Sequence, residues 1–301
     1  MTPLRQIFVS PSQLETFDLC KRKWAFQQIK NRRRTEDTTA QTFGITGHTH
    51  AQNWLKQGTL PPDTPEGAAM RQGIEHLPAP SPEILTEHEF ALGLFNEIVL
   101  AGQIDVMVPP HLHNGRPLVI DHKFTKDIRY AKTHADLAND NQAVIYGVVA
   151  METYKVKEVE ARWLYYVASG KAVRKPKGAR PVSRVLTFDG MQEPWNRIVQ
   201  TCDELATLKR NVTKAHDVEP TVTACTAFGG CEFADICERP KGSVLAAHFK
   251  QFEKMHGVKN GSGHSLSLGD RIQSQQQNAQ PTETTTMGSL SDKLNKSWRK
   301  N

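Results

Sequence analysis

The sequence contains no apolar stretch long enough to cross a membrane, because no run approaches the roughly 20 apolar residues that a spanning helix needs. Its first residues, Met-Thr-Pro-Leu-Arg-Gln, lack the long apolar core of a secretory signal. The phosphate-binding loop pattern G-x-x-x-x-G-K-[ST] occurs nowhere in the chain. We therefore expect a soluble, cytoplasmic protein that contacts no membrane and carries no ATP-driven motor of its own.

Cysteine is scarce and unevenly placed. The chain has five cysteines, and an odd number without a secretory signal argues against a disulfide framework and for reduced thiols or metal ligands. Five residues separate Cys225 from Cys231 and Cys231 from Cys237, so the close C-x₂₋₄-C pairs of the usual structural zinc site are absent. Cys202 falls on the apolar face of a predicted helix, where we expect a core residue. For the other cysteines an iron–sulfur cluster, a zinc site and free buried thiols stay open at this point.

The chain is long enough for one large domain or two modest ones: it has 301 residues, of which 38% are hydrophobic and 7% aromatic. Lys and Arg number 38 against 32 for Asp and Glu, a net charge of +6 that weakly indicates a polyanionic partner. Basic residues gather at the arginines 32–34 and in a loop that contains Lys171, Arg174, Lys175, Lys177, Arg180 and Arg184. Such loops often bind phosphates, but an ordinary solvated surface explains them equally well.

Hydrophobic periodicity and turn residues divide the chain into predicted elements. The segment Ser12-Gln-Leu-Glu15 is a capping box that predicts the start of a helix. Further helices are predicted over residues 46–56, 137–154 and 192–210, strands over 85–94, 98–108, 118–124, 159–168 and 182–188, and a connection or lid over 61–82. Asn114-Gly115 predicts a hairpin between the second and third strands. Central strands with helices on either side indicate an α/β or α+β domain around a mixed sheet.

The pattern Asp121-His122-Lys123 follows the apolar residues 117–120 and carries the clearest chemistry. Residues two apart on a strand point to the same side, so Asp121 and Lys123 share a face. Asp105 lies on the preceding strand, and the predicted hairpin brings it toward Asp121. Two carboxylates beside a lysine suit Mg²⁺ or Mn²⁺, and the lysine can stabilise charge that develops on a phosphate. Taken alone, D-x-K is also typical of a surface ion pair.

Four short motifs follow one another in a fixed order: Gly44-x-x-x-His48, Gly102-x-Ile-Asp105, Asp121-x-Lys123 and Gln142-x-x-x-Tyr146. Together they resemble the PD-(D/E)XK nuclease superfamily in its RecB-like branch. The N-terminal segment 10–24, in which Cys20 is followed by basic and aromatic residues, is similar to the opening of that branch. The resemblance covers roughly residues 8 to 240.

The resemblance implies a restriction-endonuclease-like α/β core with a central mixed sheet flanked by helices. It also implies a set of ligands for Mg²⁺ or Mn²⁺: His48, Asp105, Asp121 and the backbone carbonyl of His122. Lys123 would be the catalytic lysine, while Gln142 and Tyr146 would position the DNA strand or its phosphate near the metal. Many members of the branch have Glu where this chain has Asp121, which shortens the reach to the metal by one methylene.

The resemblance further implies a [4Fe–4S] cluster that joins the N- and C-terminal segments. RecB-like iron–sulfur nucleases place one cysteine before the nuclease motifs and three after them. The matching cysteines in this chain are Cys20, Cys225, Cys231 and Cys237. The gap between the first two of the C-terminal three is wider here than in many members.

These features predict a metal-dependent DNA exonuclease that acts in recombination, repair or replication. One alternative is a CRISPR-adaptation nuclease that trims DNA before integration. Another is a catalytically silent iron–sulfur subunit that binds DNA. The intact set of His48, Asp105, Asp121 and Lys123 argues against the silent subunit, because a scaffold has no use for all four.

Residues 1–255 are expected to form the nuclease domain with its cluster, and residues 256–301 a polar, disordered tail. The tail contains a near-repeat, Ser-Leu-Gly-Asp-Arg-Ile at 267–272 and Ser-Leu-Ser-Asp-Lys-Leu at 289–294. Each copy would form a one-turn apolar patch as a helix. One interpretation is a docking motif for a single-strand-binding or annealing protein. Chance similarity within a biased tail is the other.

Overall fold

The computed structural model describes residues 6–30, 38–95, 97–125, 127–167 and 178–237. Residue contacts divide them into two compact units. The larger unit comprises residues 6–14 and 38–203, and the smaller unit comprises residues 15–30 and 204–237. The arginines 32–34, the greater part of the basic loop and the tail with its near-repeat lie outside the described residues.

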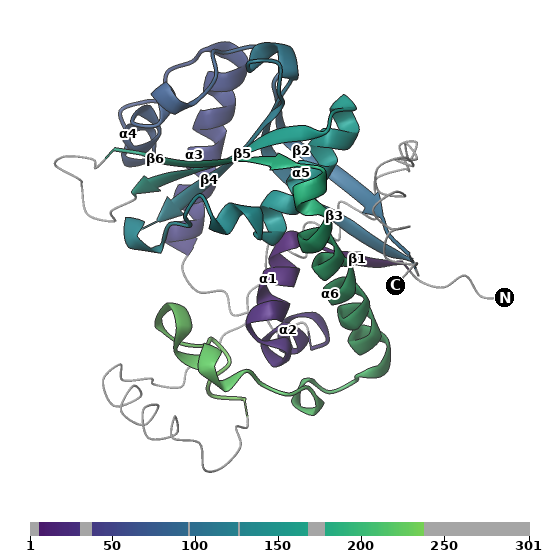
Figure 1. The fold of residues 1–301 in the computed structure, drawn as a ribbon. Coiled ribbons are helices and arrows are strands. Elements are labelled where there is room, and N and C mark those ends of the chain that lie inside the picture. Colours follow the sequence, from purple (N-terminus) through teal and green to yellow (C-terminus); the bar gives the residue numbers. More distant parts are fainter. Residues whose placement is uncertain (1–5, 31–37, 96, 126, 168–177, 238–301) are drawn as a thin grey trace. The chain divides into compact units, whose positions relative to one another are not determined.

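The larger unit is built on a six-stranded mixed sheet (Figure 1). Its strands are β1 (Ile7–Val9), β2 (Leu85–Gly93), β3 (Ile98–Val108), β4 (Leu118–Thr125), β5 (Glu158–Val167) and β6 (Arg180–Thr187). β2 runs antiparallel along one edge of β3, while parallel β1 and antiparallel β4 share its other edge. β5 is parallel to β4, and β6 is antiparallel to β5. The predicted mixed sheet is confirmed, and Asn114 and Gly115 both have the positive φ expected of their turn.

The edge of β3 that β1 and β4 share contains a gap in pairing. β1 pairs with β3 as far as Leu100, and β4 pairs with it from Val106 onward. Among the described strands, none pairs with this edge between those two points. Backbone groups that face this gap have no strand partner among the described residues, so side chains or water must satisfy them. The gap therefore gives polar side chains a place beside β3.

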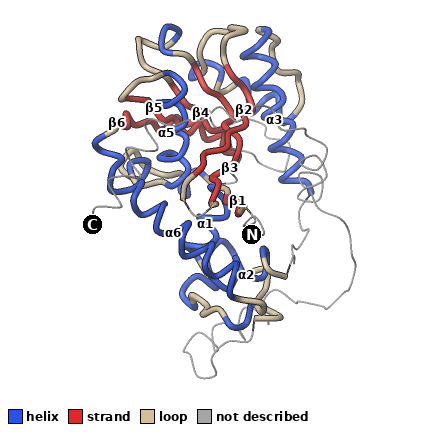
Figure 2. The backbone as a smooth tube through the Cα atoms, turned by 90° about the vertical axis from the view of Figure 1, so that its right-hand side faces the viewer, coloured by secondary structure: helices blue, strands red, loops and turns tan. Residues whose placement is uncertain are grey.

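Helices cover both faces of this sheet (Figure 2). α3 (Thr38–Gln57) and α4 (Pro65–Arg71) pack on the face that carries Leu164 and Tyr166 of β5. α5 (Asn141–Tyr154) packs on the opposite face, where its residues approach Val159 and Trp163. Alternate residues of a strand point to opposite sides of its sheet, so the even-numbered β5 residues face α3 and α4 and the odd-numbered ones face α5. α6 (Gln192–Asn211) begins in the larger unit.

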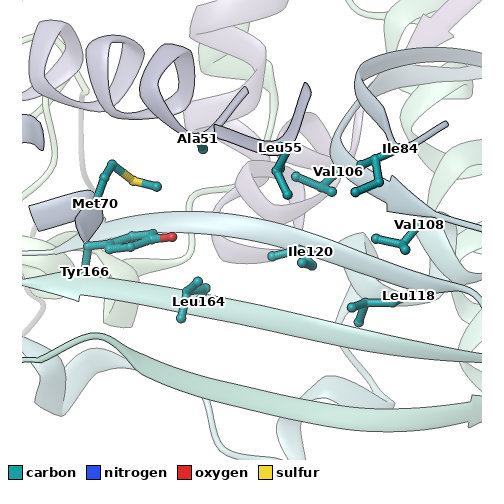
Figure 3. Close-up of a cluster of buried hydrophobic side chains, with 10 residues drawn as sticks. All are labelled: Ala51, Leu55, Met70, Ile84, Val106, Val108, Leu118, Ile120, Leu164 and Tyr166. Carbon is teal, nitrogen blue, oxygen red and sulfur yellow. The ribbon is translucent and has the colours of Figure 1, made fainter. Parts of the chain in front are cut away.

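The core between the sheet and helices α3 and α4 is apolar and closed. It consists of Ala51, Leu55, Met70, Ile84, Val106, Val108, Leu118, Ile120, Leu164 and Tyr166, each at most 1% exposed (Figure 3). Full burial of one large apolar side chain contributes about 1.5–3 kcal/mol before the entropy of ordering it is counted. This packing holds β3 and β4 rigidly, and these strands carry Asp105 and Asp121.

The smaller unit combines an N-terminal helical segment with residues 204–237. α1 (Pro11–Leu19) enters it and ends before Cys20, whose extended backbone separates α1 from α2 (Lys21–Gln28). Arg22 is buried and donates hydrogen bonds to the carbonyls of Val218 (2.5 Å) and His216 (3.1 Å). Phe26 stacks on Phe233 at a centroid distance of 5.1 Å. These contacts join two segments that are about two hundred residues apart in the chain.

Short 3₁₀ helices complete the described structure at Ile74–His76, Pro110–Leu112, Ile128–Tyr130, Asp136–Ala138, Asp189–Met191, Ala215–Asp217 and Val222–Gly229.

Several predicted element boundaries were wrong. The first helix begins at Pro11 and is capped by Ser10, whose hydroxyl accepts the amide of Gln13 at 3.2 Å, so Ser12 is not the cap. α3 begins eight residues earlier than predicted, at Thr38. The connection 61–82 contains α4, and the helix predicted from residue 137 starts at Asn141, because the Asp140 carboxylate caps it through Ala143. β1 was not predicted, since three residues are too short to show a period.

Candidate metal centre

Three side chains from three different elements converge at one end of the gap in β3. They are His48 from α3, Glu87 from β2 and Asp105 from β3, and their ligand atoms all lie within 4.8 Å of one another. The Nδ1 atom of His48 is 3.4 Å from Glu87 Oε1 and 3.6 Å from Asp105 Oδ2. All three side chains are partly exposed, so solvent reaches the group. An imidazole and two carboxylates form a donor set that suits Mn²⁺ and Mg²⁺.

Glu87 was missed by the sequence analysis. The ladder pairs Thr86 with Val106 and His88 with Ile104, which places Glu87 across from Asp105. The φ of Glu87 is +51°, a left-handed conformation that costs about 1–2 kcal/mol for a residue with a side chain. The side-chain amide of Gln103 stabilises this conformation by donating a hydrogen bond to the backbone carbonyl of Glu87 at 3.1 Å. Strain of this kind inside a strand is typical of a functional position.

Asp105 lies where the β3–β4 ladder stops. The last pairs are Val108 with Leu118, Met107 with Val119 and Val106 with Ile120, so the next pair would have been Asp105 with Asp121. Instead, Oδ2 of Asp105 accepts the backbone amide of His122 at 2.7 Å. The carboxylate thus takes the place of a ladder bond and is fixed between the two strands as they part.

The electrostatics of the group favour a cation. Burial, together with the charge of Asp121, raises the pKa of Asp105 to about 7, although His48 and the His122 amide oppose the rise. Burial alone would lower the pKa of His48, but Glu87, Asp105 and Asp121 outweigh it, and the pKa is raised. Neighbouring carboxylates raise each other's pKa values, and a cation bound between them would favour the ionised form of both.

Asp121 and Lys123 form a second group beside the first. Nζ of Lys123 is 2.7 Å from Asp121 Oδ2 and donates to Gln142 Oε1 at 2.9 Å. Gln142 in turn donates from Nε2 to Asp121 Oδ1 at 2.7 Å. Asp121 is buried and its pKa is raised, because burial outweighs the neighbouring lysine. The amide of Gln142 therefore holds both the carboxylate and the ammonium of the D-x-K motif.

Tyr146 connects this network to the gap in β3. Its hydroxyl accepts from Gln142 Nε2 at 2.8 Å and donates to the backbone carbonyl of Gln103 at 2.6 Å. Gln142 and Tyr146 lie four residues apart, on one face of α5. The Q-x-x-x-Y motif thus supplies a hydrogen-bond donor to the Gln103 carbonyl, which lies in the stretch of β3 where no described strand pairs on that edge.

The His122 side chain points away from Asp121 and Lys123. Its Nδ1 atom lies 3.0 Å from the hydroxyl of Tyr166, and its ring lies 5.5 Å from that of His48. Burial, aided by His48 and Lys123, lowers the pKa of His122 to about 3, so the ring is neutral. The strand alternation that pairs Asp121 with Lys123 accounts for this placement.

The structure therefore brings His48 and Asp105 together with Glu87, and it brings Asp121 and Lys123 together with Gln142 and Tyr146. Asp121 is not a member of the group of three. The sequence contained a signal for Glu87, because pairing the predicted strands 85–94 and 98–108 as a hairpin places Glu87 opposite Asp105.

In the smaller unit, four cysteines line one cavity: Cys20, Cys225, Cys231 and Cys237. The sulfur of Cys20 accepts the backbone amide of Thr221 at 3.4 Å, and that of Cys237 accepts from Arg22 at 3.8 Å. Burial raises the pKa of Cys231, while the Phe233 amide and Lys23 lower it. Among the described cysteines, no three sulfur atoms lie within 4.8 Å of one another. Cys202 is fully buried in the larger unit.

The molecule is an α/β protein with a candidate metal centre. Its mixed sheet has a gap in pairing along one edge of β3, and two carboxylates, an imidazole and an Asp–Lys pair lie beside that gap. The sequence matches the model of the PD-(D/E)XK nuclease superfamily over residues 9–83 and 74–238. The chain belongs to this superfamily, and its sheet flanked by helices is consistent with a restriction-endonuclease-like core.

Two solved structures are similar at low identity. The crystal structure of SSO0001 is 13% identical, with a TM-score of 0.42, over 77% of this chain and 86% of that one. That of a "putative exonuclease" from Eubacterium rectale is 12% identical, with a TM-score of 0.46, over 80% of this chain and 92% of that one. No curated protein matches the chain. Within the described residues, no helix has both the length and the apolar character needed to span a membrane.

Proposed function

We propose that the protein is a metal-dependent DNA exonuclease that acts in recombination, repair or replication. The observation that carries the proposal is the convergence of His48, Glu87 and Asp105 next to the Asp121–Lys123 pair. Membership of a nuclease superfamily supports hydrolysis of phosphodiester bonds. The RecB-like order of the motifs supports DNA as the substrate and an exonuclease mode.

The residues present fit a divalent cation. His48, Glu87 and Asp105 would hold it, and Asp121 lies close enough to affect the pKa values of both His48 and Asp105. A Mg²⁺ or Mn²⁺ ion there would supply Lewis-acid activation of water and neutralise charge on the scissile phosphate. The proposed ligand set thus retains His48, Asp105 and Asp121 and adds Glu87. The role proposed for the His122 carbonyl stays a prediction.

Lys123 is the proposed catalytic lysine. Its ammonium contacts both Asp121 and Gln142, and its side chain is 34% exposed. A fixed, partly exposed positive charge can donate to a phosphate oxygen as negative charge develops there. Gln142 and Tyr146 are proposed as positioning residues. Their polar groups already bind Asp121, Lys123 and the Gln103 carbonyl, so they would act on DNA through Lys123.

We further propose that Cys20, Cys225, Cys231 and Cys237 hold a [4Fe–4S] cluster. All four cysteines line one cavity, so a single cofactor could bind them together. Their spacing lacks the close C-x₂₋₄-C pairs of the usual structural zinc site. The N–H groups of Thr221 and Arg22 that reach two of the sulfurs stabilise thiolate charge. The cluster would join residues 15–30 to residues 204–237 and act as a structural constraint.

The proposal is tested by incubating end-labelled linear DNA and closed circular DNA with the protein and Mg²⁺ or Mn²⁺. Release of label from linear DNA with intact circles is expected. Lys123→Ala should abolish this release and keep most DNA binding, because phosphate contacts elsewhere do not need the metal. Lys157→Ala is the matched control, since Lys157 is exposed and precedes β5 by one residue.

Each other result has a defined meaning. Cleavage of the circle would show an endonuclease and overturn the exonuclease mode. Binding without any cleavage would indicate the silent DNA-binding subunit instead. Unchanged cleavage by Lys123→Ala would refute the proposed site.

A further inference from the structure

An apolar rim borders the candidate metal centre on the side of α3. It consists of Phe43 and Phe124, which we call the α3 rim. The ring of Phe124 is 5.9 Å from that of His48, and the ring of Phe43 is 5.6 Å from that of Phe124. Phe43 and Phe124 are both partly exposed. Two aromatic side chains therefore reach solvent directly beside the candidate metal centre.

The rim is rigidly supported. Phe124 stacks on Tyr166, which belongs to the closed core, with centroids 5.0 Å apart and an angle of 18° between the rings. Gly47 lies against the same ring, and a Cβ added at Gly47 would overlap Phe124. Phe43 meets Phe124 edge to face at 71° and is itself partly exposed. Phe43 is therefore the outer ring of an aromatic stack whose inner end is fixed in the core.

The position of the rim limits what can cover it. A scissile phosphate at the metal centre carries a sugar and a base, and the base lies one sugar away from the phosphate. In duplex DNA that base is paired and stacked on its neighbours, so its faces are closed to the protein. In a single strand the base presents a free aromatic face, and stacking on a protein aromatic is worth about 1–3 kcal/mol per base in any sequence.

We propose that the α3 rim is a stacking platform for an unpaired nucleobase of the strand whose phosphate occupies the metal centre, with Phe43 as the positioning residue. The substrate class of the site is accordingly single-stranded DNA or a frayed single-stranded end. This inference rests on the proposed nuclease function, because it takes the metal centre as the phosphate site.

The test measures binding rather than cleavage. A fluorescent oligothymidylate and a sugar–phosphate strand of the same length without bases are titrated with the full chain, with Ca²⁺ in place of Mg²⁺ to occupy the oxygen ligands. Phe43→Ala should weaken binding of the oligothymidylate about tenfold, the loss of one stacked base. The same variant should bind the strand without bases as the unmodified protein does. Phe43→Tyr keeps a ring and should bind both strands normally.

Phe8→Ala is the matched control. Phe8 is also a phenylalanine and is 46% exposed, but it pairs with Val99 on β3, six residues or about 20 Å along the strand from Asp105. Its substitution should leave both affinities unchanged. Thermal unfolding of each variant checks that the fold is retained.

Equal loss of affinity for both strands in Phe43→Ala, or no loss for either, would overturn the platform. Failure of the nuclease proposal is separate, since it appears as an absence of cleavage by the unmodified protein with Mg²⁺ and Mn²⁺. A base-dependent loss with no cleavage would keep the platform and remove the exonuclease.

Discussion

Tyr146 donates its phenolic hydrogen to the backbone carbonyl of Gln103 at 2.6 Å, across the gap in β3. A residue of the Q-x-x-x-Y motif thus completes the hydrogen bonding of the strand that carries Asp105. The same hydroxyl accepts from Gln142, which holds Asp121 and Lys123. Tyr146 links the two groups of the candidate site through one oxygen atom.

Tyr146→Phe should lower the free energy of unfolding by about 0.5–1.5 kcal/mol, because the partly buried hydrogen bond to the Gln103 carbonyl is lost. Cleavage should fall as well, since Gln142 loses an acceptor and Lys123 loses its fixed position. Denaturant unfolding and a nuclease assay measure the two effects. Tyr130→Phe removes the same atom from a residue that is 74% exposed and should change neither. A Tyr146→Phe protein as stable as the unmodified one would remove the proposed role of the hydroxyl.

Glu87→Gln should remove most of the stabilisation that Mn²⁺ gives to the folded protein. A ligand that binds only the folded state raises the melting temperature by an amount that grows with the logarithm of its concentration over its Kd. Replacing a carboxylate by an amide weakens a hard-cation site. The measurement is the melting temperature with Mn²⁺ and with a chelator. Glu89→Gln lies two residues along β2 on an exposed position and is the control. If Glu87→Gln responds to Mn²⁺ as the unmodified protein does, Glu87 is not a ligand.

Metal binding should release a proton at low pH. The pKa of Asp105 is about 7 in the metal-free protein, raised by burial and by Asp121, so its carboxyl is mostly protonated at about pH 6 and mostly ionised at about pH 8. A cation must displace that proton at the lower pH, and its affinity should fall up to about tenfold for each pH unit below the pKa. Calorimetry in buffers of different ionisation enthalpy counts the protons. The same count at both pH values would contradict the raised pKa.

Anaerobically purified protein should be brown and contain about four irons per chain. Cys20→Ala should lose the colour and much of the stability, because the link between residues 15–30 and 204–237 is lost. Cys202→Ala should keep the colour, since Cys202 is buried in the larger unit and does not line the cavity. The checks are metal and sulfide analysis with visible absorption spectra. Stoichiometric zinc without iron or sulfide would exclude the cluster.

The sequence by itself determined the class of fold and the superfamily. The strand pattern, the Asn114-Gly115 turn and the motif order are local features, readable over a few residues each. They placed Asp105 and Asp121 on neighbouring strands and Lys123 on the same face as Asp121. The even spacing of Cys225, Cys231 and Cys237 was visible in the same way.

Other features were decided only by the tertiary structure. The short β1 leaves part of one edge of β3 unpaired, and no local sequence pattern predicts such a gap in pairing. The gap gives Tyr146 a backbone partner and turns Gln142 toward Asp121 and Lys123. Glu87 joins His48 and Asp105 through a left-handed backbone that strand propensity would not predict. Hydrogen-bond satisfaction and strain depend on residues far apart in the chain, so they become visible only when the strands are assembled.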